Sequence, residues 1–200
     1  MSLNNPEYVK IGNKKYKINT DFRVALECNN IAQDENIDIN EKSLAIICKL
    51  FGDDGLDNPQ DWEELMRLGF KFLTLNKNVD DVDQSTEVDM DFEQDRAYIR
   101  SSFIQDYNYN PYDKGYLHWW DFYNDLNNLS NNEFGNCCIL NRVRNLRTLD
   151  LSKIKDFKER ERLAKAKEAV SLKKNKRDVK LTKEQEESMN KLNEIIGFKK

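Results

Sequence analysis

The sequence contains a single histidine, His118, which is the first candidate for acid–base chemistry. A histidine that acts as a general base needs a hydrogen-bonded partner and a cleft, and the residues around His118 indicate neither. The surrounding segment, residues 116–123, is rich in aromatic side chains, which favours a histidine packed at the surface of a helix over a catalytic one. We therefore assign no catalytic residue and expect that the protein is not an enzyme.

Four cysteines offer metal-binding or redox chemistry, but their spacing supports neither. Cys28, Cys48, Cys137 and Cys138 form no Cys-x-x-Cys pair, and adjacent cysteines do not easily bridge each other. Because the chain has only one histidine, we expect no zinc site of the usual ligand sets. We predict reduced thiols in a cytosolic compartment, mostly buried as small hydrophobic side chains.

Acidic clusters could supply oxygen ligands for calcium. Asp89, Asp91 and Glu93 alternate as in a calcium-binding loop, but Gln94 stands where such a loop requires glycine. Residues 53–64 have the right length with glycine and asparagine in the wrong positions, so we interpret both stretches as solvated acidic loops. The sequence has no glycine-rich phosphate loop and no Gly-x-Ser-x-Gly motif. We expect no metal and no cofactor.

Charge divides the chain into an acidic body and a basic tail. Residues 1–150 hold 16 Lys and Arg against 27 Asp and Glu, a net charge of −11, whereas residues 151–200 hold 16 against 9, a net charge of +7. A basic tail can bind nucleic acid by releasing counterions from phosphates. Acidic residues are interleaved in this tail and the acidic body would repel a duplex, so we prefer a solvated helix. The basic residues concerned are Lys165, Lys167, Lys173, Lys174, Lys176, Arg177 and Lys180.

The composition predicts a mainly α fold. The chain has 10 Phe, 8 Tyr and 3 Trp, which argues against disorder, and only 7 Gly and 3 Pro, which favours long helices. Alternating apolar and polar residues around Gly12-Asn13 predict a small N-terminal β-hairpin at about residues 8–18. We therefore expect a compact helical domain with this hairpin and a charged C-terminal helical extension.

Capping residues and helical spacing predict where the helices begin and which side chains form the core. We expect helices to begin at Asp21, at Asp38, at Asn58-Pro59, at Asp89 or Asp91, near Tyr116, at Asn131 or Asn132, at Ser152 and at Thr182. An acidic, aperiodic stretch at about 76–89 is interpreted as a solvated linker. The predicted core residues are Trp62, Phe72, Ile99, Phe103, Trp120 and Phe122.

The predicted organisation is an acidic helical body at 1–150 and a basic helical tail at 151–200. An apolar stripe near the end of the tail, from Met189 to Ile196, can lie in the groove of a partner protein with Leu192, Ile195 and Ile196 as anchors. Two alternatives stay open: the stripe folds back onto the body, or it pairs with its copy in a dimer. No apolar run approaches the length of a membrane span and the N-terminus has no signal-peptide pattern, so we expect a cytoplasmic protein.

Two stretches carry a resemblance to a known family. The first is Asp91-Phe92-Glu93-Gln94-Asp95 with Tyr98, Ile99, Phe103 and Tyr107; the second is Leu117-His118-Trp119-Trp120-Asp121-Phe122 with Leu126, Leu129, Arg144 and the run Arg147–Ile154 that leads into the charged segment 155–167. In this order they resemble the "gene product fifteen" family of tailed bacteriophages of Gram-positive hosts. The resemblance covers roughly residues 15–170, and Leu-His-Trp-Trp is its most specific part.

The resemblance implies a tail assembly chaperone in the host cytoplasm, encoded near the tape-measure protein. Such a protein would keep the long helical tape measure soluble while tail-tube subunits, a second candidate partner, assemble around it. The family pattern brings no catalytic residues. The alternatives are a minor structural or adaptor protein of the tail, which would remain in the particle, and a nucleic-acid-binding accessory protein that acts through the basic tail. Oligomers are compatible with each.

Overall fold

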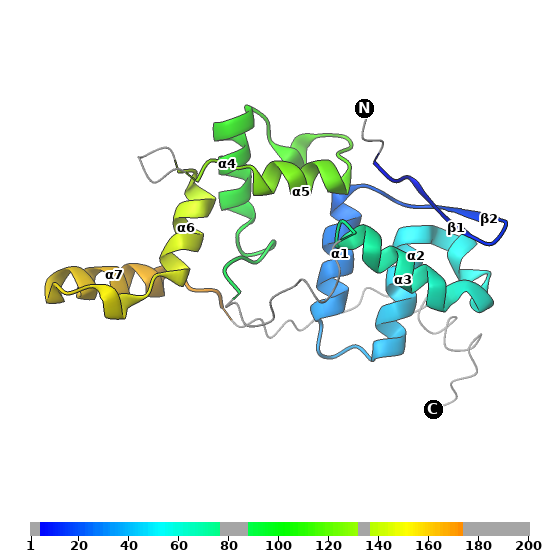
Figure 1. The fold of residues 1–200 in the computed structure, drawn as a ribbon, viewed down its shortest axis with the longest axis horizontal. Helices are drawn as coiled ribbons and strands as arrows, with labels where there is room; N and C mark the ends of the chain where they lie inside the picture. Colours follow the sequence, from blue (N-terminus) through cyan, green and yellow to red (C-terminus); the bar gives the residue numbers. More distant parts are fainter. Residues whose placement is uncertain (1–4, 77–87, 132–136, 174–200) are drawn as a thin grey trace.

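The computed structural model describes residues 5–76, 88–131 and 137–173, which are mainly α-helical with one small β-hairpin, as predicted (Figure 1). Most of the predicted linker at 76–89 lies outside the described residues, and so does the stripe at 189–196. Within the described ranges, no helix is long and apolar enough to cross a membrane.

The described elements are two strands, seven α-helices and three turns of 3-10 helix. The strands are β1 (Tyr8–Ile11) and β2 (Lys14–Lys17). The α-helices are α1 (Phe22–Gln33), α2 (Ile39–Leu56), α3 (Trp62–Leu73), α4 (Arg96–Tyr107), α5 (Trp119–Asn127), α6 (Ile139–Thr148) and α7 (Phe157–Ala169). Single turns of 3-10 helix cover Pro59–Asp61, Pro111–Asp113 and Leu151–Lys153.

The hairpin forms where the sequence predicts it. Strands β1 and β2 pair antiparallel, with Ile11 opposite Lys14 across the turn at Gly12-Asn13. Gly12 has a φ of 56°, a conformation that glycine adopts without strain. A two-stranded hairpin is only marginally stable alone, and here it is held by the buried Tyr16, whose hydroxyl donates to the carboxylate of Asp61 just before α3.

Two of the predicted helix starts are confirmed in detail. The side chain of Asp21 accepts a hydrogen bond from the backbone of Arg23 and caps α1, and Asp38 accepts one from Asn40 and caps α2. Helix α2 bends at Gly52, which has a φ of 62°, continues for one further turn and ends at Leu56.

Other helices begin later than the sequence predicts. Helix α5 begins at Trp119 and not near Tyr116, because the preceding residues are extended: Phe22 N–H donates to the carbonyl of Leu117, and Trp119 N–H donates to the carbonyl of Thr20. These two bonds use the backbone groups that an earlier helical turn would need. The chain before α5 therefore pairs with the start of α1.

The starts predicted for α4, α6 and α7 are also wrong by several residues. Helix α4 has Asp95 at its N-cap position, whereas Asp91 closes a turn ahead of it by accepting from Glu93 and Gln94. Helix α6 is capped by the Cys138 sulfur and not by Asn131 or Asn132, and α7 is capped by Asp156 and not by Ser152. Each true cap lies at least a full helical turn beyond the predicted one.

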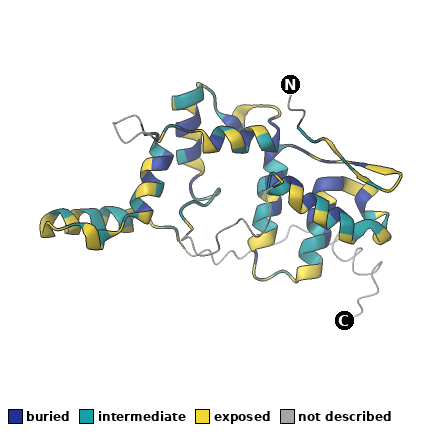
Figure 2. Ribbon diagram, in the orientation of Figure 1, coloured by how far each residue is buried: buried dark blue, intermediate teal, exposed yellow. Residues whose placement is uncertain are grey.

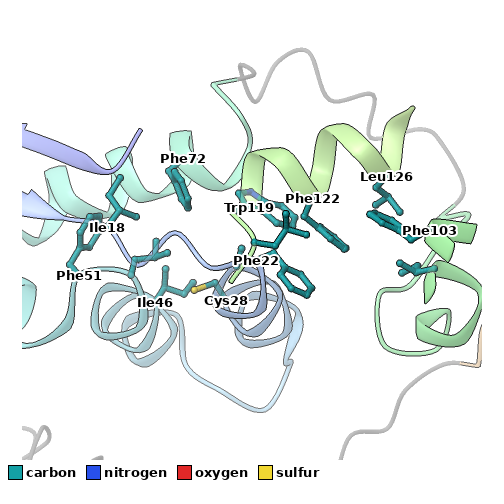
Figure 3. Packing of buried hydrophobic residues seen from close by; sticks show 14 of the residues in the cluster. Ile18, Phe22, Cys28, Ile46, Phe51, Phe72, Phe103, Trp119, Phe122 and Leu126 are labelled. Atoms are coloured by element: carbon teal, nitrogen blue, oxygen red, sulfur yellow. The ribbon is translucent and has the colours of Figure 1, made fainter. Parts of the chain in front are cut away.

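Stacked aromatic rings make the centre of the core, where α1, α4 and α5 meet (Figure 3). The ring of Phe122 lies 4.5 Å from that of Phe22 and 5.4 Å from that of Phe103, measured between centroids, and Trp119 stacks on it at 5.9 Å. Aromatic pairs at such distances contribute about 0.5–1.5 kcal/mol each beyond the area they bury. Phe122, in α5, therefore packs its helix against both α1 and α4.

The core prediction is confirmed for four of its six residues. Phe72, Ile99, Phe103 and Phe122 are buried. The prediction is wrong for Trp62 and Trp120, because both are only partly buried and pack against the outside of the cluster. The buried member of the Trp-Trp pair is Trp119, which is 4% exposed.

The two adjacent tryptophans complete the hydrogen bonds of α3. The indole N–H of Trp119 donates to the carbonyl of Leu73 at 3.0 Å, and that of Trp120 donates to the carbonyl of Phe72 at 2.9 Å. The last carbonyls of a helix have no partner within the helix, so an external donor satisfies them. This explains how two large side chains, adjacent in sequence, hold the C-terminal end of α3 against α5.

The molecule is elongated, and its elements differ in burial along the long axis (Figures 1 and 2). The connection between α2 and α3 lies at one end, below the turn of the hairpin, and α7 forms the other end. Helices α1, α3 and α5 show dark, buried faces, whereas α7 shows only exposed and intermediate residues.

Candidate interaction surface

Helix α7 projects from the body as an arm, which we define as residues 151–173. The helix contains no buried residue, and its first residue, Phe157, is 66% exposed. The side chain of Asp156 caps the helix by accepting from the backbone of Glu159 at 2.7 Å. Such a helix is not stabilised by burial of an apolar face, so local interactions must support it.

Ion pairs along the arm supply part of that support. Glu161 pairs with Lys165 at 2.8 Å, as the spacing predicts, and Glu159 pairs with Arg162 at 2.7 Å. These pairs are exposed to solvent, so each stabilises the helix only weakly. Asp156 and Arg160 also lie four residues apart, but the Asp156 carboxylate caps the helix instead. The Arg160 guanidinium lies over the ring of Phe157 at 5.7 Å.

The turn that leads into the arm is held by Asp150. Its carboxylate accepts from both the backbone N–H and the hydroxyl of Ser152, at 3.0 and 2.7 Å. These hydrogen bonds lower the pKa of the Asp150 carboxyl below its ordinary value. The residue predicted to cap the long basic helix therefore belongs to the 3-10 turn before it.

The far end of α7 returns to the body and is tied there. Lys167 donates to the carbonyl of Leu149 at 2.9 Å, so the C-terminal part of α7 lies next to the residues that lead into the arm. Arg147, in α6, donates through Nε to the carbonyl of Val170 at 2.6 Å. Because the C-terminal end of α7 is the attached one, its N-terminal end, with Phe157, is the free tip.

Arg147 is the centre of this anchor. Its guanidinium makes two hydrogen bonds to the carboxylate of Asp95, at the start of α4, and donates also to the carbonyl of Asp89 at 2.9 Å. The side chains of Arg147 and Asp95 are only 9% and 1% exposed. A buried charge must be paired and hydrogen-bonded, and this arginine uses its donors to hold α4, α6 and the arm together.

A second clamp lies immediately beyond. The side-chain amide of Gln94 accepts from the backbone N–H of Lys173 at 2.8 Å and donates to the carbonyl of the same residue at 3.0 Å. This reciprocal pair resembles one rung of a β-ladder, made by a side chain. It fixes the main chain at Lys173 against the start of α4.

The predicted anchors Leu192, Ile195 and Ile196 lie outside the described residues. The basic residues Lys165, Lys167 and Lys173 are described, and two of them are engaged by Glu161 and by the carbonyl of Leu149. Lys174, Lys176, Arg177 and Lys180 fall outside the described ranges.

The attachment of the arm to the body through Arg147 and Asp95 was not predicted from the sequence. Arg147 and Asp95 both belong to the stretches that carry the family resemblance, yet nothing in their local sequence indicates that they pair. One pattern could have indicated a buried ion pair. Arg147 lies in the apolar stripe of α6 with Leu140 and Val143, and an arginine in such a position needs a buried partner. Spacing alone could not identify which carboxylate that is.

His118 has a structural place that differs from the predicted one. It is 6% exposed and not at a helix surface, and it is the N-cap of α5: Nδ1 accepts from the backbone N–H of Trp120 at 3.0 Å. The other nitrogen, Nε2, lies 3.3 Å from the carbonyl of Pro6 and must donate to it, because a carbonyl only accepts. Both ring nitrogens are therefore engaged with backbone groups.

The acidic and thiol groups considered as ligands are dispersed among the described residues. No group of three His, Cys, Asp or Glu side chains in these ranges could hold a metal ion. Asp89 pairs with Arg144 at 2.9 Å, and Asp91 closes the turn before α4, so two of the calcium candidates have structural partners.

Comparison with known families identifies the class of protein. The family model described as "Bacteriophage Gp15 protein" matches residues 3–172, which include the body and nearly all of the arm. The chain belongs to this family and is a bacteriophage protein. Neither the curated proteins nor the solved structures provide a match.

Proposed function

We propose that this protein is a tail assembly chaperone that binds the tape-measure protein and assists assembly of the tail tube. The observation that carries the proposal is membership of the Bacteriophage Gp15 protein family over residues 3–172. Such a chaperone acts by binding alone, because it must keep a long apolar helix soluble and needs no covalent step. A charged, mainly helical protein suits this role.

The arm supports this proposal physically. Its helix contributes no residue to the core, so it is free to contact another protein without loss of the fold. The Gln94–Lys173 clamp holds the chain directly before residues 174–200, which contain the proposed anchors Leu192, Ile195 and Ile196. A fixed origin for a binding segment lowers the entropy lost when a partner is bound.

The alternative function is binding of nucleic acid through the basic tail. Within the arm, Arg162 and Lys165 are already paired with carboxylates of Glu159 and Glu161. Interleaved acids of this kind weaken binding to phosphates, so a protein partner is favoured. A gel-shift assay over a range of salt concentrations distinguishes the two functions.

Co-expression with the tape-measure protein tests the proposal. We expect the wild-type chain to keep the tape measure in the soluble fraction and to be retained with it in a pull-down. The variant Leu192→Asp/Ile195→Asp/Ile196→Asp should lose both. The matched control, Ile39→Asp/Val88→Asp, alters two apolar residues that are 69% and 78% exposed on the body and should keep both.

Three outcomes would change the assignment. Retention of the tape measure by the triple variant would show that these residues are not the anchors. A lowered melting temperature or a dimer turned monomer would support folding back or pairing of the stripe. Detection of the protein in purified particles by mass spectrometry would favour the structural or adaptor role over a chaperone.

A further inference from the structure

The free tip of the arm carries basic charge without carboxylate partners. Lys155, Lys158 and Arg160 are exposed and form no ion pair with any residue in the described ranges. Phe157 lies among them and is 66% exposed. Described residues 151–173 hold eight Lys and Arg against four Asp and Glu, a net charge of +4.

The opposite end of the molecule carries the complementary charge. Residues 53–64, which run from the last turn of α2 through its connection into the first turn of α3, contain six Asp and Glu and no Lys or Arg. Asp53, Asp54 and Asp57 are exposed there, and within the described ranges they form no ion pair. We refer to these three residues as the acidic end.

The fold keeps these two charges apart within one molecule. Helix α7 and the α2–α3 connection lie at opposite ends of the long axis (Figure 1). The clamps at Arg147 and Gln94 hold the base of the arm against α6 and the turn before α4, so the tip is directed away from the body. Electrostatic attraction between the tip and the acidic end can therefore be satisfied only between two molecules.

We propose that the tip of the arm docks on the acidic end of a second copy of this chain, head to tail. Lys155, Lys158 and Arg160 of one copy meet Asp53, Asp54 and Asp57 of the next, and Phe157 is removed from water at the centre of the contact. The contact joins two different surfaces, so it repeats and produces open chains or closed rings. This interface is independent of the tape-measure proposal.

The hairpin brings opposite charge to the same end and provides the matched control. Lys14 is already paired with Asp61 at 3.0 Å. Lys10, Lys15 and Lys17 are exposed on the hairpin, where Lys15 lies over the ring of Tyr8 at 3.7 Å. Neutralising these three lysines changes as many charges as the test variants do, without touching the acidic end.

Sedimentation velocity on the full-length chain tests the interface. Self-association should be strong at about 0.01 M salt and lost at about 1 M, because the screening length falls from about 30 Å to about 3 Å. Two neutral variants, Lys155→Gln/Lys158→Gln/Arg160→Gln and Asp53→Asn/Asp54→Asn/Asp57→Asn, should each associate at least about tenfold more weakly than wild type. The control Lys10→Gln/Lys15→Gln/Lys17→Gln should associate at least as strongly as wild type, because it removes positive charge from the end that binds the basic tip.

An equimolar mixture of the two charge-neutralised variants tests most directly whether the tip binds the acidic end. One variant retains an intact acidic end and the other an intact tip, so an equimolar mixture can form one contact and no second. The expected product is a discrete 1:1 dimer, where wild type forms longer species. Circular dichroism of each variant shows whether its fold is retained.

The proposal is overturned if wild type remains monomeric at low salt, or if the neutral variants associate as wild type does. It is overturned equally if the mixture of folded variants stays monomeric. Weakened association of the hairpin control, with the acidic-end variant unchanged, would move the contact to the hairpin and also contradict it.

Discussion

Arg147 donates hydrogen bonds to both carboxylate oxygens of Asp95, at 2.7 and 2.8 Å, across 52 positions of the sequence. The carboxylate also accepts from the backbone N–H of Asp91 at 3.0 Å. This pair joins α6 to the start of α4, and through the other donors of Arg147 it joins both to the arm. Its removal should therefore affect the body and the arm together.

Arg147→Met should lower the free energy of unfolding by about 3–5 kcal/mol, because it leaves the buried carboxylate of Asp95 without its counter-charge. Arg162→Met is the matched control: this arginine is 74% exposed and pairs with Glu159, so its loss should leave the free energy of unfolding nearly unchanged. Urea unfolding followed by circular dichroism measures both. Equal losses in the two variants would argue against a buried, stabilising pair in solution.

The Trp-Trp pair should respond unequally to truncation. Trp119→Ala removes a buried ring and should cost about 3–5 kcal/mol, whereas Trp120→Ala should cost less, because Trp120 is partly exposed. Trp119→Phe keeps an aromatic ring but leaves the carbonyl of Leu73 without its donor, a loss of about 1–3 kcal/mol. Thermal and urea unfolding rank the three variants. A larger loss for Trp120→Ala than for Trp119→Ala would contradict the burial of Trp119.

Gly55→Ala should destabilise the last turn of α2. An added Cβ would lie 2.7 Å from the Cβ of Phe51 and 3.1 Å from Cγ2 of Ile47, and the Cβ of Phe51 is fixed by the backbone. The expected cost is about 1–3 kcal/mol from overpacking. At Gly115, by contrast, an added Cβ meets nothing within 4 Å, so Gly115→Ala should change stability by less than about 0.5 kcal/mol. A stabilised Gly55→Ala variant would show that the helix turn can shift freely.

The thiols should differ in reactivity and in their effect on alkaline stability. Burial raises the pKa of Cys28 from 9.0 to about 12, while Cys48 is exposed. A thiol reagent at about pH 8 should modify Cys48 in the native protein and Cys28 only after unfolding, because the thiolate is the reacting form. Mass spectrometry after digestion identifies the modified residue, and early labelling of Cys28 would contradict its burial.

The same shift determines the sign of the pH effect. A thiol whose pKa is higher in the folded chain stabilises the fold fully below the unfolded value and loses this contribution as pH rises. For Cys28 the loss falls between pH 9 and about 12. Cys28→Ala should therefore show a weaker decline in stability over that range than wild type.

The sequence predicts those features that depend on neighbours in the chain. The hairpin at Gly12-Asn13 and the caps Asp21 and Asp38 are local arrangements of a few residues, and all three are confirmed. The mainly α fold follows from composition and periodicity in the same way. Four of the six predicted core residues are likewise buried.

The errors arise where several local choices have similar energies and a distant contact decides among them. Asparagine and aspartate are frequent, so many positions could cap a helix, and Asn131 is as good a local candidate as Cys138. The start of α5 is set by hydrogen bonds to Thr20 and Phe22, far earlier in the chain. The interaction surface depends in the same way on the Asp95–Arg147 pair, which no periodicity reveals.

The positions of the three tryptophans allow unfolding of the body to be measured separately from unfolding of the arm. All three indoles donate to backbone carbonyls near the ends of α2 and α3, with Trp62 bonded to Gly55 at 3.1 Å, and none lies in the arm. Fluorescence therefore reports unfolding of the body alone, while far-ultraviolet circular dichroism also includes α7. Transitions that coincide would mean that the arm melts as one cooperative unit with the body, and an earlier dichroism transition would mean that it melts first.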